Sequence, residues 1–219
     1  KTTVAFALHL LTSQPGAHVL VVCPKAAFPA WNEIVEDTMN PQGPDADAFQ
    51  VLSGTGSAIE AMLTGGGRRF VINYDLLIQH PGIIGSYLAR QPVHLILDES
   101  HRMKAGEASQ RGALLLNFAP LPIRRDVLSG TPMPQAPSDL VSQLNFLWPG
   151  QGLGLEITRG TPPREVLGNL YVRTTKEELG LPARYTHFHQ VGMGPGQLAL
   201  YGLVRSESLR QLSNIRPGS

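Results

Sequence analysis

The chain has 219 residues, of which 16% are charged, and a formal net charge of +1 at pH 7. This length can bury one substantial core with an appendage, and the charge balance excludes attraction of nucleic acid by the overall field of the protein. The single cysteine, Cys23, excludes an intrachain disulfide and favours the cytoplasm, or the nucleus of a eukaryote, and no apolar run approaches the roughly 18 residues of a membrane span.

Apolar segments and helical stretches alternate along most of the chain. Helices are predicted at 2–12, 29–38, 57–63, 83–90 and 107–118. Four apolar segments between them, rich in Val, Ile and Leu, are typical of strands buried on both faces: 19–23, 70–73, 94–98 and 126–129. The alternation predicts an α/β fold, with a mostly parallel sheet and helices on both faces.

Polar or turn residues follow each predicted strand. In open parallel sheets, ligands bind beyond the carboxyl ends of the strands. We therefore expect the four strand-end pairs to converge on one edge of the sheet: Pro24-Lys25, Tyr74-Asp75, Asp98-Glu99 and Gly130-Thr131.

The pattern changes after Trp148, where glycine and proline become frequent. We place a domain boundary there, which gives a lobe at 1–148 and an extension at 149–219. Within the extension, a strand is predicted at 185–191 and a helix at 196–212. In the lobe, 41–47 is predicted to be a surface loop, and the triple glycine at 65–67 is interpreted as a turn because a strand, not a helix, follows it.

The acidic pair Asp98-Glu99 is the strongest chemical signal. Magnesium-dependent phosphoryl transfer needs one carboxylate near the metal and a second near the attacking water. Adjacent residues at the end of a strand can point in these two directions. Many strands end in acids, so the pair gains weight only from the other motifs around it.

Lys1-Thr2 opens the first helical stretch, as Lys-Thr does in the phosphate-binding motif GxxxxGK[ST]. Lys1 would bring positive charge to the β- and γ-phosphates, and the Thr2 hydroxyl would ligate Mg²⁺. The glycines of that motif are not in the chain, so we expect it to begin inside the motif, as a fragment of a larger ATPase. At the fourth strand end, Gly130 and Thr131 are interpreted as a sensor of the γ-phosphate, with a plain tight turn as the alternative.

The motif order resembles the first motor lobe of superfamily-two helicase-like ATPases, and the later motifs narrow the resemblance to Swi/Snf-type DNA translocases. The earlier motifs are Lys1-Thr2, Val21–Lys25 with Trp31, Asn73–Leu77, Asp98–His101 and Leu128–Pro132. The later ones are Tyr171–Lys176, Leu181-Pro182 and Val191–Met193 with Gln197 and Tyr201.

This resemblance implies a RecA-like P-loop NTPase lobe that binds ATP and Mg²⁺ and contacts the backbone of double-stranded DNA. Lys1, Thr2 and Thr3 would bind the nucleotide, Thr2 and Asp98 the metal, and Glu99 would act on the water with Asp98. His101 would couple this site to DNA, with an ordinary surface histidine as the alternative. Pro24, Lys25 and Tyr74 would line the DNA path; the alternatives are a turn, a solvated lysine and a packed tyrosine. Trp31 is interpreted as a core anchor, and Arg173 and Lys176 as a basic patch or a solvated pair.

The same resemblance implies a second RecA-like lobe in the full-length protein, toward which 149–219 would form a protrusion or linker. We expect the 219-residue chain alone to hydrolyse ATP negligibly, because the phosphate-binding glycines and the arginines of the second lobe would come from elsewhere. Two alternatives stay open: the motor of a restriction, DNA-repair or RNA helicase enzyme, and a non-catalytic interaction module that retains the fold.

Overall fold

The computed structural model describes residues 1–38, 48–103, 106–174 and 185–214, with the single residues 178, 180 and 182. The chain divides into two compact units, Lys1–Tyr171 and Val172–Ser219. The predicted loop at 41–47, together with Lys176 and Leu181, lies outside the described residues.

The first unit is built on a five-stranded sheet in the order β2-β3-β1-β4-β5, in which every pairing is parallel. The strands are β1 (His18–Val22), β2 (Gln50–Val51), β3 (Arg69–Ile72), β4 (Val93–Asp98) and β5 (Arg124–Leu128). The predicted α/β class and parallel sheet are confirmed. β2 was not predicted, because two residues are too short to show a periodicity.

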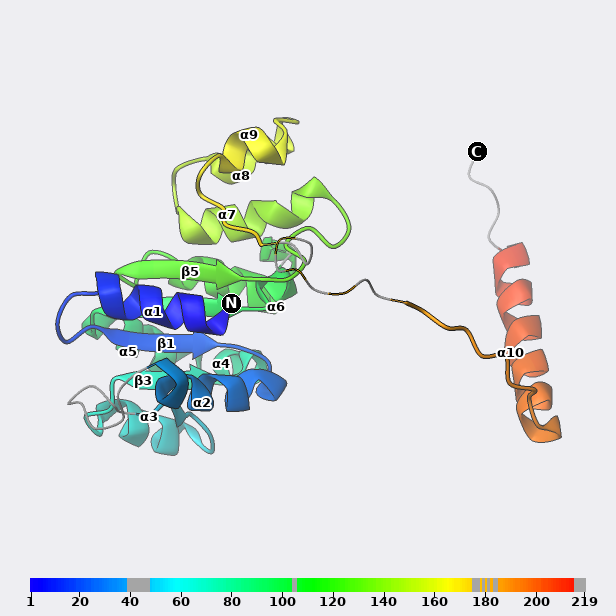
Figure 1. Ribbon diagram of the computed structural model, residues 1–219, viewed down its shortest axis with the longest axis horizontal. Helices are drawn as coiled ribbons and strands as arrows, with labels where there is room; N and C mark the ends of the chain where they lie inside the picture. The colour runs from blue at the N-terminus through cyan, green and yellow to red at the C-terminus, as the bar shows by residue number, and fades with distance from the viewer. Residues whose placement is uncertain are drawn as a thin grey trace. The chain divides into compact units, whose positions relative to one another are not determined.

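Helices cover both faces of this sheet, as predicted (Figure 1). One face is covered by α1 (Thr2–Thr12) and α2 (Phe28–Thr38). Phe6 of α1 and Trp31 of α2 pack there against alternate strand residues such as Val19 and Val21. This alternation follows from the two-residue period of a strand. Trp31 is fully buried, which confirms its interpretation as a core anchor.

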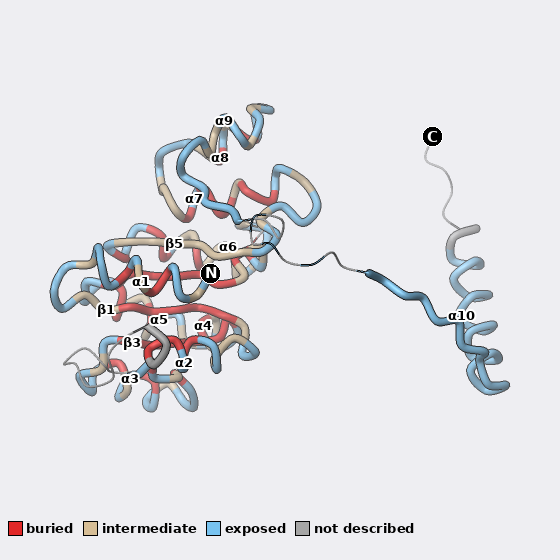
Figure 2. Tube along the Cα trace, in the orientation of Figure 1, coloured by how far each residue is buried: buried red, intermediate tan, exposed pale blue. Residues whose placement is uncertain are grey.

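The opposite face carries the larger core. It is covered by α3 (Gly56–Thr64), α4 (Tyr74–Gln79), α5 (Pro81–Arg90) and α6 (Gln110–Phe118). Leu20 and Val22 of β1 point to this side, beside Leu95 and Leu97 of β4. The central strands are therefore buried on both faces, as Figure 2 shows by their red colour.

Three short helices continue the first unit beyond the sheet: α7 (Val141–Leu147), α8 (Leu153–Thr158) and α9 (Pro163–Leu167). Leu140 and Leu144 pack with Ile157 in a small third core, and the compact unit extends to Tyr171, past the predicted boundary at Trp148. The glycines and prolines in this stretch connect short helices.

The predicted strand at 185–191 is wrong. The segment has no regular secondary structure, and its residues are exposed (Figure 2). The second unit contains one long helix, α10 (Pro195–Asn214), close to the prediction. None of the described helices combines the length and the apolar character needed to cross a membrane.

Candidate nucleotide-binding site

The carboxyl ends of the strands meet at one edge of the sheet, and the N-terminus of α1 lies at the same edge. Lys1 Nζ donates a hydrogen bond to Glu99 Oε1 at 3.1 Å, although the two residues are 98 positions apart. A Cβ built on Gly130 would lie 4.0 Å from the same Lys1 nitrogen. Lys1, at the start of α1, and two of the predicted strand-end pairs are therefore adjacent in space.

Asp98 is held in place from several sides. Its carboxylate accepts the Glu99 backbone N–H at one oxygen (3.0 Å) and the indole N–H of Trp31 at the other (3.3 Å). The hydroxyl of Tyr74 donates to the Asp98 backbone carbonyl at 2.8 Å. Asp98 is 7% exposed. These bonds fix the direction of a carboxylate at the end of the central β4 strand.

Glu99 adopts a left-handed backbone conformation, with φ 54, which is uncommon for a residue other than glycine. Such strained conformations gather at functional sites, where the surrounding structure maintains them. Here the Glu99 carboxylate contacts two side chains, those of Lys1 and His101. One carboxylate oxygen pairs with Lys1 and the other lies 3.2 Å from His101 Nδ1.

His101 also connects the acidic turn to the segment after β5. The Ser129 hydroxyl lies 3.5 Å from His101 Nδ1, and Ser129 Oγ accepts the backbone N–H of Thr131 at 3.1 Å. The predicted sensor residues thus follow directly after a side chain that touches the acidic turn. Thr131 and Gly130 are exposed, and accessible to a ligand.

The donor set fits Mg²⁺ that arrives with a phosphate ligand. Mg²⁺ is usually held by one or two carboxylates, with water and substrate phosphates filling the other positions. Asp98 offers one such carboxylate, and Thr2 carries a hydroxyl in the first turn of α1. Among the described residues, no group of three or more His, Cys, Asp or Glu side chains forms a closed metal cage.

The three residues expected along the DNA path differ in accessibility. Lys25, in the short helix Lys25–Ala27, is exposed, and Pro24 is half-buried. Tyr74 is only 2% exposed, and burial raises the pKa of its hydroxyl above the usual range. Its hydroxyl is occupied by Asp98 and its ring carries Arg111 at 5.4 Å. Tyr74 is therefore a packed tyrosine in this structure, and its contact with DNA stays a prediction.

Thr2 is half-buried and Thr3 exposed, both in the first turn of α1. The predicted helix start at Thr2 is confirmed, so both hydroxyls lie where the helix N-terminus meets the strand ends. Sequence reasoning missed two neighbours of the site: the indole of Trp31 as a donor to Asp98, and Gln143, which bonds Ser100. Trp31 had been placed only in the core, and no motif marked Gln143.

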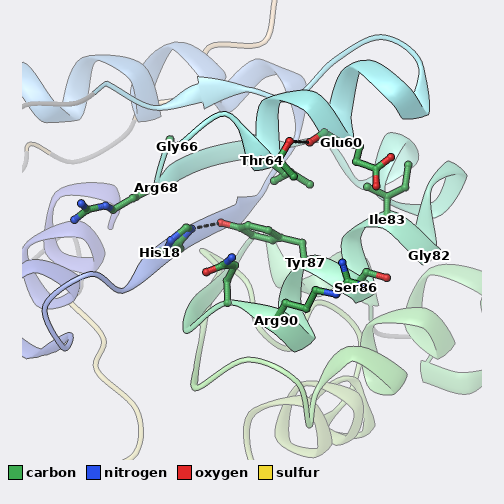
Figure 3. A pocket seen from close by; sticks show the side chains of 13 residues that line it. His18, Glu60, Thr64, Gly66, Arg68, Gly82, Ile83, Ser86, Tyr87 and Arg90 are labelled. Atoms are coloured by element: carbon green, nitrogen blue, oxygen red, sulfur yellow. Dashed lines mark hydrogen bonds between the residues drawn. The ribbon is translucent and has the colours of Figure 1, made fainter.

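A separate hollow lies at the other edge of the sheet, where the strands begin (Figure 3). It has a volume of about 770 Å³ between α3, α5 and the loop before β3. At its centre Tyr87 shares a hydrogen bond of 2.7 Å with His18, the first residue of β1. None of the predicted nucleotide residues lines it, so the hollow and the candidate site are distinct.

Comparison with known proteins identifies the family of this lobe. The SNF2-related domain matches residues 2–152. The chain belongs to the SNF2-related family. The matched range begins at the first helix and includes the acidic turn, the segment after β5 and α7.

Several curated proteins are similar to this SNF2-related chain. The probable ATP-dependent DNA helicase CHR12 of Arabidopsis thaliana is 31% identical over 155 residues, which cover 67% of the chain and 13% of CHR12. The DNA repair and recombination protein RAD54 of Saccharomyces cerevisiae is 27% identical over 236 residues, covering 88% of the chain and 26% of RAD54. The chain thus spans 13% of the length of CHR12 and 26% of that of RAD54, and the match to RAD54 extends beyond the SNF2-related domain.

Proposed function

We propose that this chain is the ATP-binding lobe of an ATP-dependent motor that moves on double-stranded DNA. The observation that carries the proposal is the contact between Lys1 and Glu99 at 3.1 Å, with Gly130 beside the same ammonium group. In a SNF2-related chain, this arrangement is the one that a phosphate-binding lysine and a catalytic acid require. The names of CHR12 and RAD54, a probable DNA helicase and a DNA repair protein, support DNA as the partner.

In the proposed reaction, Lys1 exchanges Glu99 for the β- and γ-phosphates of ATP. An ammonium group stabilises the charge that develops on transferred phosphate. Thr2 and Asp98 would hold Mg²⁺, which would neutralise phosphate charge when bound. The released Glu99 then orients the attacking water and accepts its proton. The two carboxylates already have different partners: Glu99 contacts Lys1 and His101, and Asp98 accepts the Trp31 indole N–H.

Lys25 and Pro24 form the part of the proposed DNA path that the structure leaves accessible. The greater length of the relatives supports a second motor lobe in the full-length protein, with the chain after Tyr171 as the connection. Because the proposed partner is DNA, we expect the protein to act in the cytoplasm or, in a eukaryote, in the nucleus. The alternative function is the motor of a restriction, DNA-repair or RNA helicase enzyme, which would use the same residues to hydrolyse ATP.

The test uses the full-length protein and compares ATP hydrolysis with duplex DNA, single-stranded DNA and duplex RNA. We expect duplex DNA to give the largest stimulation. Glu99→Gln should retain ATP binding and lower kcat by about two to four orders of magnitude, because an amide cannot accept the proton of the water.

The matched control is Glu60→Gln, which changes an exposed glutamate of α3 beside the opposite hollow. It should leave hydrolysis unchanged. If Glu99→Gln retained turnover within about threefold of wild type, Glu99 would not be the base. Stimulation by RNA and not by duplex DNA would favour the RNA helicase alternative, and absence of ATP binding would favour an interaction module.

A further inference from the structure

A buried amide lies beneath the candidate site and joins two of its segments. Gln143 of α7 is 2% exposed. Its carbonyl oxygen accepts a hydrogen bond from the Ser100 hydroxyl at 2.7 Å. Its amide nitrogen donates to the backbone carbonyls of Pro132 at 2.8 Å and Asp139 at 2.9 Å. Both donors and the acceptor of this side chain are therefore used.

The groups that Gln143 bonds belong to functional segments of the lobe. Ser100 follows Asp98 and Glu99 directly, in the acidic turn. Pro132 follows Thr131, in the segment after β5. One rigid amide thus sets the distance between the turn that would hold Mg²⁺ and water and the segment that would sense the γ-phosphate.

The far end of the second segment is fixed as well. The Asp139 carboxylate accepts the backbone N–H groups of Gln135 at 2.8 Å and Ala136 at 3.2 Å. Because Gln143 bonds the Asp139 carbonyl, the loop between Pro132 and Asp139 is tied to α7 at both ends. These bonds connect the start and the end of the loop to the same helix.

A second connection joins the same two segments, but it is weaker. His101 and Ser129 are 3.5 Å apart, at the limit of a hydrogen bond, and His101 is 32% exposed. Hydrogen bonds in a buried environment are stronger than those in contact with water. Beyond the backbone pairing of β4 with β5, the Ser100–Gln143–Pro132 connection is the more buried of these two side-chain links between the segments, among the residues that the structure describes.

We propose that Gln143 is a positioning residue that couples the acidic turn to the segment at 129–132, so that a nucleotide-dependent shift of one moves the other. The proposal rests on the proposed function. Only an amide supplies the acceptor for Ser100 and the two donors for the carbonyls; leucine supplies neither, and glutamate lacks the donors.

The experiment measures steady-state ATP hydrolysis by the full-length protein, with and without duplex DNA. The variants are Gln143→Leu, Gln143→Glu, Ser100→Ala and the double variant of Gln143→Leu with Ser100→Ala. Ser142→Ala is the matched control, because its buried hydroxyl lies next in the same helix and has no hydrogen-bond partner among the described residues. Thermal unfolding of each variant verifies the fold, and Gln143→Glu, which preserves shape, serves where Gln143→Leu does not fold.

We expect the Gln143 and Ser100 variants to lose about tenfold or more of the DNA stimulation of kcat, with KM for ATP within about threefold of wild type. The double variant should be no worse than Gln143→Leu, because both changes break one connection. In wild type, an ATP analogue that is not hydrolysed should alter amide hydrogen exchange at both 99–102 and 129–132; in Gln143→Leu it should alter only one of them.

Folded variants that keep wild-type DNA stimulation and exchange changes in both segments would overturn the coupling while leaving the proposed function intact. Equal losses in Ser142→Ala would also overturn it, since the effect would then be general to α7. Wild-type protein without DNA-stimulated hydrolysis would instead refute the proposed function, and this inference with it.

Discussion

Acidification should destabilise the first unit through one buried histidine, His9, near the end of α1. His9 is 5% exposed, and its Nδ1 lies 3.0 Å from His94 Nδ1 and 2.8 Å from Ser13 Oγ. His94 in turn bonds Asp126 at 3.0 Å. Burial, followed by the nearby His94, Arg69 and Arg124, lowers the pKa of His9 from 6.5 to about 4. His9 is therefore neutral in the folded protein at neutral pH.

The sign and size of the effect follow from proton linkage. Between pH 6.5 and 4 the unfolded chain protonates His9 and the folded chain does not, so the free energy of unfolding falls as the pH falls. With these two pKa values, the loss from His9 between pH 7 and pH 5 is about 2 kcal/mol. The loss of unfolding free energy from His9 reaches its full value only below about pH 4, the pKa of His9 in the folded protein. The lowered pKa of Asp126 acts in a separate window, below its ordinary value of 3.8.

The measurement is urea unfolding of the chain at pH 7, 6 and 5, with His9→Asn beside wild type. Asparagine offers a polar atom near the position of Nδ1 but does not titrate in this range. The variant should lose about 2 kcal/mol less than wild type between pH 7 and pH 5. His18→Asn should also reduce the loss of unfolding free energy between pH 7 and pH 5, but by less than His9→Asn, since burial also lowers the pKa of His18.

His187→Asn, in the exposed segment before α10, is the control and should follow wild type. The same pH dependence in wild type and His9→Asn would refute the reasoning, because the acid sensitivity would then have another origin.

Two further predictions concern stability and accessibility. Burial and the charge of Asp98 raise the pKa of Cys23 to about 12, so a maleimide should label it about three orders of magnitude more slowly in native than in denatured protein; rapid native labelling would contradict its burial. A Cβ at Gly112 would overlap the carbonyl oxygen of Gly106, whereas one at Gly82 meets nothing within 4 Å. Gly112→Ala should therefore lower the free energy of unfolding by about 2 kcal/mol or more and Gly82→Ala should not lower it, and equal thermal shifts would contradict this.

The sequence predicted the sheet well where strands are continuously apolar. β1 and β4 lie within one residue of the predicted strands, because their residues are buried on both faces. β5 begins at Arg124, two residues before the predicted start. The start of β5 was not predicted because its first two residues are arginines, which are not typical of a buried strand. Arg125 is accommodated there because it donates hydrogen bonds to the carbonyls of Ala119 and Leu147.

The short elements were harder to predict than the long ones. α4 has six residues, too few for a helical period, although Asn73 caps it by accepting the backbone N–H groups of Asp75 and Leu76. The expected convergence of Asp98-Glu99 and Gly130-Thr131 followed from the rule for parallel sheets, whereas Lys1 was singled out through the phosphate-binding motif. Gln143 could not be predicted in this way, because its role depends on contacts between segments distant in sequence.

The central position of β1 has a consequence for synthesis of the chain. β1 pairs with β3 on one side and β4 on the other, and both follow it in the sequence. A nascent chain therefore carries Val19–Val22 without either pairing strand until β3 has been synthesised, and completes the central sheet only when β4 emerges. Pairings between such distant segments form slowly, since a long loop must close first. During that interval the most apolar strand of the first unit depends on the ribosome and on chaperones for protection against aggregation.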